Sequence, residues 1–101
     1  MKIKVANMNE VPDGQLKKVM VGKEPVALFN IGGQIFATTN ICTHEQCKLD
    51  ENHLITGEIV ECTCHGSQFN VKTGANVLPP AAEPLKTYKV FVEGEDVFVE
   101  S

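Results

Sequence analysis

The sequence predicts an all-β fold, a small antiparallel β-sandwich or barrel that carries a loop-rich segment. Short runs of β-branched and aromatic residues alternate with polar residues, and turns rich in Gly and Pro separate these runs. No window longer than about ten residues keeps helical periodicity. The chain has 101 residues, of which 43% are hydrophobic and 22% charged. This size and composition are typical of one globular domain, which we assign to residues 1–101.

The first part of the chain predicts four strands. In the first of them Ile3 and Val5 share one face, and a Val-Pro-Asp-Gly turn at residues 11–14 follows it. Gly32 and Gly33 separate the third strand from the fourth and predict a tight hairpin, because the turns that suit hairpins need positive φ. The predicted strands cover residues 2–6, 16–21, 26–31 and 34–38.

The rest of the chain predicts a second hairpin and, before it, a different kind of segment. The hairpin is formed by residues 87–92 and 97–100 around a turn at 93–96. From about residue 40 to about residue 84, Cys, His, Gly and Pro become dense and the strand pattern weakens. This loop-rich subdomain predicts only short strands at 59–60 and 69–71 and a turn at 72–74.

Composition excludes several classes of function. The chain has 13 acidic and 9 basic residues, none of them Arg, with a net charge of −4. It therefore lacks the basic surface that binds nucleic acid. No apolar stretch is long enough to span a membrane, and the first 14 residues lack the apolar core of a signal peptide. We expect a cytoplasmic protein without membrane or nucleic-acid partners.

The four Cys and three His are the residues most able to bind a metal or carry redox chemistry. Six of these seven residues gather in two short segments, in the order Cys42, His44 and Cys47, then Cys62, Cys64 and His65. The pairs Cys-x-His and Cys-x-x-His could hold tetrahedral zinc, although Cys-x-His is closer than common zinc-finger spacing. The same ligands also suit a [2Fe–2S] cluster in which two His replace two Cys on one iron.

These segments resemble a known family. CTHEQCKLDE and CTCHGSQFNVKTG are similar to the two cluster loops of soluble Rieske-type [2Fe–2S] ferredoxins, and LPPAAEPLKTYKV is similar to the Pro-rich loop and next strand of those that serve ring-hydroxylating oxygenases. The resemblance covers nearly the whole chain. It implies one [2Fe–2S] cluster per chain, with Cys42 and Cys62 on one iron and His44 and His65 on the other. It also implies a cluster-binding subdomain at about residues 40–84.

Cys47 and Cys64 are not needed as ligands. Their positions resemble those of respiratory and photosynthetic Rieske proteins, in which a disulfide ties the two cluster loops together, whereas many oxygenase ferredoxins lack both Cys. The resemblance thus implies a Cys47–Cys64 disulfide. Two reduced small residues near the cluster are the alternative in a reducing cytosol.

Other residues near or between the two motifs also have expected roles. In respiratory Rieske proteins a Ser and a Tyr at the positions of Ser67 and Phe69 donate hydrogen bonds to cluster sulfurs, which raises the potential. Ser67 keeps this role or bonds its own backbone, and Phe69 mainly packs in the core. Gly66 predicts a positive φ or a close approach to the cluster. His53, outside both motifs, is expected to be a solvated loop residue.

Size and site together predict a one-electron carrier rather than an enzyme, because a chain this small has little room for a substrate pocket. The resemblance implies a flavin-dependent NAD(P)H reductase as donor and a terminal Rieske oxygenase as acceptor, both in transient complexes with a monomer. Alternatives are a small Rieske subunit of an assimilatory nitrite reductase, or another electron-transfer system. A structural zinc module and a thiol–disulfide enzyme using Cys62 and Cys64 are more distant alternatives.

Overall fold

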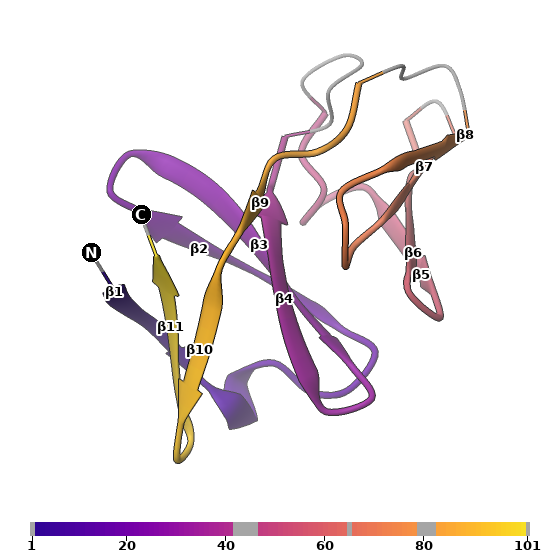
Figure 1. Ribbon diagram of the computed structural model, residues 1–101. Helices are drawn as coiled ribbons and strands as arrows, with labels where there is room; N and C mark the ends of the chain where they lie inside the picture. Colours follow the sequence, from indigo (N-terminus) through magenta and orange to yellow (C-terminus); the bar gives the residue numbers. More distant parts are fainter. Residues whose placement is uncertain (1, 42–46, 65, 79–82, 101) are drawn as a thin grey trace.

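The computed structural model describes residues 2–41, 47–64, 66–78 and 83–100. The described strands form three sheets in which every pairing is antiparallel (Figure 1). The prediction of an all-β antiparallel fold is therefore confirmed. Within these described ranges, no helix is long and apolar enough to cross a membrane.

The first two sheets face each other and form a barrel-like body. The first sheet has the order β1-β11-β10, and the second has the order β2-β3-β4-β9. A short 3-10 helix, η1 (Met8–Glu10), follows β1 and is capped by Asn7. The strands of the body are β1 (Lys2–Asn7), β2 (Leu16–Val21), β3 (Glu24–Ile31), β4 (Gln34–Thr39), β9 (Thr87–Tyr88), β10 (Val90–Glu93) and β11 (Asp96–Glu100).

The third sheet lies beside the second and away from the first (Figure 1). Its order is that of the chain, because each strand pairs with the next through a short connection. The sheet consists of β5 (His53–Thr56), β6 (Ile59–Cys62), β7 (Ser67–Asn70) and β8 (Asn76–Leu78).

Strand β3 is buried on both faces and separates two hydrophobic cores. Successive strand residues point to opposite faces, so Val26 and Leu28 enter the core between the first two sheets. Ala27 and Phe29 enter a second core, which the third sheet shares. All four side chains are fully buried. The second sheet is thus a wall with apolar residues on both sides.

The predicted strands agree with the structure where alternation is strong. The strand at 16–21 has the predicted bounds, and the Gly32-Gly33 hairpin is confirmed by the pairing of Ile31 with Gln34. The run at 87–92 is wrong as a single strand. It divides into β9, which pairs with β4, and β10, which pairs with β11, so the chain passes from one sheet to the other. Strands β5 and β8 were not predicted, because their short sequences carry little alternation.

Candidate metal centre

The second of the two Cys-containing segments is the connection between β6 and β7. Cys62 ends β6 and lies opposite Ser67, the first residue of β7. The backbone N–H of Gly66 donates to the Cys62 carbonyl at 2.8 Å, which closes a tight turn. Gly66 has φ +82°, so the predicted positive φ is confirmed. A Cβ placed at Gly66 would meet no described atom within 4 Å.

The first segment follows β4. The chain on its two sides, residues 40–41 and 48–50, is hydrogen-bonded together and forms a stem. Ile41 and Lys48 form an isolated antiparallel bridge, and Leu49 next to it is fully buried in the second core. The Thr63 N–H donates to the Asn52 carbonyl at 3.2 Å, so the exit of the first segment touches the start of the second. The fold therefore brings together two segments that lie far apart in the sequence.

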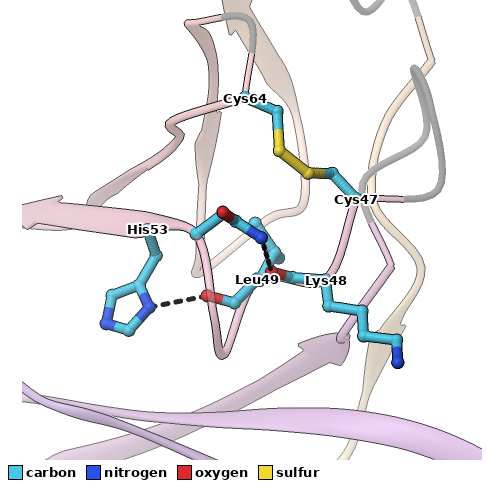
Figure 2. Close-up of a disulfide and its surroundings, with 6 residues drawn as sticks. Cys47, Lys48, Leu49, His53 and Cys64 are labelled. Carbon is cyan, nitrogen blue, oxygen red and sulfur yellow. Dashed lines mark hydrogen bonds between the residues drawn. A yellow bond between two sulfur atoms is a disulfide. The ribbon is translucent and has the colours of Figure 1, made fainter.

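Sulfur atoms gather where the two segments meet. Cys47 and Cys64 are joined by a disulfide, with their Cα atoms 6.7 Å apart (Figure 2). Cys62 stays outside this disulfide, and its side chain is 1% exposed. The Sγ atoms of the three Cys lie within 4.8 Å of one another. This point is rich in sulfur, and its deepest residue is shielded from water.

Three of the four predicted ligands, Cys42, His44 and His65, lie outside the described residues. The structure therefore positions one predicted ligand, Cys62, together with the two Cys of the disulfide. Ser67 is buried with 0% exposure, opposite Cys62 in register. Phe69 is fully buried in the second core, which agrees with its expected packing role.

The prediction that His53 is a solvated loop residue is wrong. His53 is the first residue of β5, it is half-buried, and it lies opposite Cys62 in the β5–β6 pairing. Its Nδ1 lies 2.6 Å from the Leu49 carbonyl. Figure 2 draws this contact as a dashed line. A carbonyl accepts a hydrogen bond, so Nδ1 carries the proton in this contact. The contact ties the start of β5 to the stem of the first segment.

Sequence reasoning missed two residues below the first segment, Asn40 and Asp50. Asn40 has 0% exposure, and its amide bonds to Asp50 in both directions. The available signal was a polar residue directly after the alternating fourth strand and two positions before Cys42.

In the described part of the chain, the ionisable groups with a perturbed pKa are Glu24, Glu58 and Tyr88, none of which belongs to the two Cys-containing segments. The hydroxyl of Tyr88 donates to Glu24 at 2.6 Å, and this bond and Lys86 hold the pKa of Glu24 below its ordinary value. Burial, followed by the bond to Glu24, raises the pKa of Tyr88. A hydrogen bond from Asn70, followed by the nearby Lys72, lowers the pKa of Glu58.

Two hollows among the described residues also lie away from the Cys. An open groove of about 530 Å³ runs between β4 and β10, and a hollow of about 190 Å³ lies on the outer face of the third sheet. Neither hollow is lined by Cys47, Cys62 or Cys64.

Comparison with known proteins adds a family to this geometry. Residues 1–89 match a family model described as the Rieske [2Fe–2S] domain. The biphenyl dioxygenase ferredoxin subunit of Pseudomonas sp. (strain KKS102) is 41% identical over 97 residues, which cover 96% of this chain and 89% of that protein.

Solved structures agree with the match. The Sphingomonas yanoikuyae B1 ferredoxin is similar with a TM-score of 0.93 and 33% identity, covering 100% of this chain and 99% of that chain. A chain from the complex of reduced oxygenase and oxidized ferredoxin in carbazole 1,9a-dioxygenase is similar with a TM-score of 0.90 and 34% identity. That match covers 97% of this chain and 91% of the other.

Proposed function

The chain belongs to the Rieske [2Fe–2S] domain family, and from this premise we propose that it is the one-electron carrier of a ring-hydroxylating dioxygenase system. The observation that carries the proposal is the burial of Cys62 at the meeting point of the two Cys-containing segments. A carrier needs a shielded redox group near the surface, and it needs no substrate pocket there.

The described residues fit a [2Fe–2S] cluster. Thiolate sulfur is the donor that iron–sulfur clusters require, and Cys62 offers it from a position that water hardly reaches. Cys62 is also held rigidly, because it ends a paired strand and its carbonyl accepts the Gly66 N–H. We assign one cluster to the chain, with the ligands Cys42, His44, Cys62 and His65.

When bound, the cluster supplies a one-electron couple whose neutral His ligands place its potential above that of four-thiolate clusters. The protein contributes the surroundings. Leu49, Val60 and Phe69 are fully buried in the core beneath Cys62 and exclude water from that side. The Cys47–Cys64 disulfide joins the two segments covalently. Ser67 supplies a buried hydroxyl beside Cys62.

The relatives support one of the two proposed partners. A structurally similar ferredoxin is described in a complex with an oxygenase, so we assign the acceptor role to a terminal Rieske oxygenase. The donor in this proposal is a flavin-dependent NAD(P)H reductase. Redox encounters of this kind bury little surface and are weak, which suits a monomer that shuttles between two partners in the cytoplasm.

Electron paramagnetic resonance of the dithionite-reduced protein tests the cofactor. We expect the low average g-value of a mixed Cys/His cluster, with two irons per chain by metal analysis. Cys62→Ser should abolish the signal, whereas the Cys47→Ser/Cys64→Ser variant serves as a matched control and should retain it. A colourless protein that binds zinc would contradict the assignment.

Stopped-flow absorbance tests the carrier role. The pre-reduced protein is mixed with the oxidised terminal oxygenase of a biphenyl dioxygenase system, and reoxidation of the protein is followed. We expect reoxidation to match oxygenase reduction at one electron per chain. Bound cluster without electron transfer to any Rieske oxygenase would leave the family assignment intact and reject this carrier role.

A further inference from the structure

Asn40 is a fully buried polar residue at the base of the first segment. Its side-chain Nδ2 donates to Asp50 Oδ1 at 2.7 Å, and its Oδ1 accepts the Asp50 backbone N–H at 2.9 Å. Its backbone is satisfied as well, since its N–H donates to the Pro25 carbonyl and its carbonyl accepts the Leu49 N–H. Asn40, which directly follows β4, is thereby hydrogen-bonded to Pro25 in β3 and to Leu49 and Asp50 on the other side of the stem.

These bonds join the two ends of the first segment. The chain leaves β4 at Asn40 and returns to the same residue at Leu49 and Asp50, with the Ile41–Lys48 bridge next to the closure. The proposed ligands Cys42 and His44 belong to the chain between these points. The Asn40–Asp50 pair therefore fixes where that chain begins and ends.

The same segment has a second tie of a different chemical kind. The Cys47–Cys64 disulfide joins it to the connection between β6 and β7. A disulfide can be cleaved by thiols, and a cytosol keeps most thiols reduced. The hydrogen bonds of Asn40 and Asp50 do not respond to thiols, and Asn40 is shielded from competing water.

Resting on the proposed function, we propose that Asn40 and Asp50 are positioning residues that hold the two ends of the first segment together, and so retain the cluster, when the Cys47–Cys64 disulfide is reduced. Either tie alone is then sufficient to retain the cluster, and loss of both releases it. This arrangement makes cluster retention independent of the thiol state of the compartment.

A matched control is available in the same sheet. Asn30, at the other end of β3, is also a buried Asn with two side-chain bonds, donating to the Val11 carbonyl at 2.7 Å and accepting the Gly33 N–H at 2.9 Å. It contacts neither Cys-containing segment in these bonds. Asn30→Ala therefore removes a comparable buried amide without touching the stem.

The test is a double-mutant cycle on the cluster-containing protein. Asn40→Ala and Asn30→Ala are each made with the disulfide intact and in the Cys47→Ser/Cys64→Ser background. The loss of visible circular dichroism is timed in the presence of an iron chelator. We expect Asn40→Ala and the Ser pair to act more than additively, with a combined release rate about tenfold above the product of the single effects. Asn30→Ala should act additively. Additive behaviour of Asn40→Ala would overturn the proposal.

Two further measurements separate a positioning role from a general structural one. Asp50→Asn keeps an oxygen that accepts from Asn40 and should retain the cluster as the wild type does. Asp50→Ala removes that acceptor but keeps the backbone N–H that donates to Asn40, so it should release the cluster faster than the wild type and more slowly than Asn40→Ala. Faster release from both variants alike would reject the role of the side-chain bond.

If the wild type carries no cluster, the proposed function fails by itself. Hydrogen exchange then tests the clamp in thiol-reduced protein, where the Leu49 and Asp50 amides should stay protected in the wild type and lose protection in Asn40→Ala.

Discussion

The barrel-like body and the third sheet bury their apolar residues in different ways. The body encloses a core of aliphatic side chains drawn from both of its sheets, with Val26, Leu28, Val97 and Val99 fully buried. The third sheet has four short strands and covers its core on one face only, against residues such as Phe29 that belong to the body. A sheet this small buries too little area to be stable by itself.

The third sheet therefore depends on a few specific links in addition to its packing against the body. These links are the Cys47–Cys64 disulfide, the contact of His53 with Leu49, and the bonds between Asn40 and Asp50. The Sγ atoms of Cys47 and Cys64 lie within 4.8 Å of that of Cys62, and His53 pairs with Cys62 in register. The difference teaches that the region proposed for the cluster gains its order from a few directional contacts, which single substitutions can remove.

The largest expected effect is that of Phe69→Ala. Phe69 is the largest side chain that the third sheet buries completely, and its loss should lower the free energy of unfolding by about 3–5 kcal/mol. Val99→Ala in the body is the control, with an expected loss of about 2 kcal/mol. Denaturant unfolding gives both values. The visible spectrum should be lost in Phe69→Ala and unchanged in Val99→Ala, and the reverse pattern would reject the division into two regions.

Gly74→Ala tests the junction between the two regions. Gly74 has φ +79°, and a Cβ there would lie 2.3 Å from the backbone oxygen of Leu85, on the chain that returns to the body. Gly74→Ala should lower the free energy of unfolding by about 3 kcal/mol, because strain in φ adds to a clash with backbone that cannot move freely. Gly94 has φ +63° and open space around an added Cβ, so Gly94→Ala should lower the free energy of unfolding by only about 1 kcal/mol. Equal melting temperatures for the two variants would contradict the clash.

Ser67→Ala should change the cluster and leave stability nearly intact. Loss of a donor to cluster sulfur removes stabilisation of the reduced state, worth about 1–2 kcal/mol, so the potential should fall by roughly 40–80 mV. Protein-film voltammetry measures the shift. An unchanged potential would show that Ser67 only shapes the turn.

The smallest effect is expected from Tyr88→Phe on the surface of the body. Because Tyr88 donates to Glu24, its removal should raise the pKa of Glu24 toward the ordinary value, which carboxylate NMR titration reports. In the wild type the lowered pKa of Glu24 contributes stability above its ordinary value of 4.5, and this is lost as pH falls through the folded-state pKa.

Tyr88, the other partner in this hydrogen bond, affects the stability of the protein at alkaline rather than acidic pH. The raised pKa of Tyr88 means that the unfolded chain ionises first above pH 10.0, so wild-type stability declines there. Tyr88→Phe should remove this alkaline decline and leave the potential of the cluster unchanged. A shifted potential would show that the body and the third sheet are electrostatically coupled.

The body could be predicted from the sequence more fully than the third sheet. Alternation in residues 16–21 and the Gly32-Gly33 turn are local signals, and the strands form where these signals place them. Strand β5 has no such signal, because its partner β6 and the stem of the first segment decide where it lies. His53 was misplaced for the same reason.

The candidate site shows the same limit. The Cys and His spacing left zinc and a [2Fe–2S] cluster as alternatives, and the resemblance of the two loops to Rieske ferredoxins predicted the cluster, which the family match bears out. The roles of Asn40 and Asp50 could not be predicted, because a ten-residue separation brings them together only after β4 and the stem have folded. Long-range hydrogen bonds of this kind leave no periodic pattern in the sequence.

The two-sided burial of β3 has a consequence for protein engineering and for evolution. Ala27 and Phe29 form part of the floor on which the third sheet rests, and they alternate with Val26 and Leu28, which fill the body. A graft of residues 40–84 onto another barrel would arrive without that floor and expose Val60 and Phe69 to water. The transplantable unit is the insert together with the β3–β4 hairpin, so a change of redox centre between scaffolds has to exchange this hairpin as well.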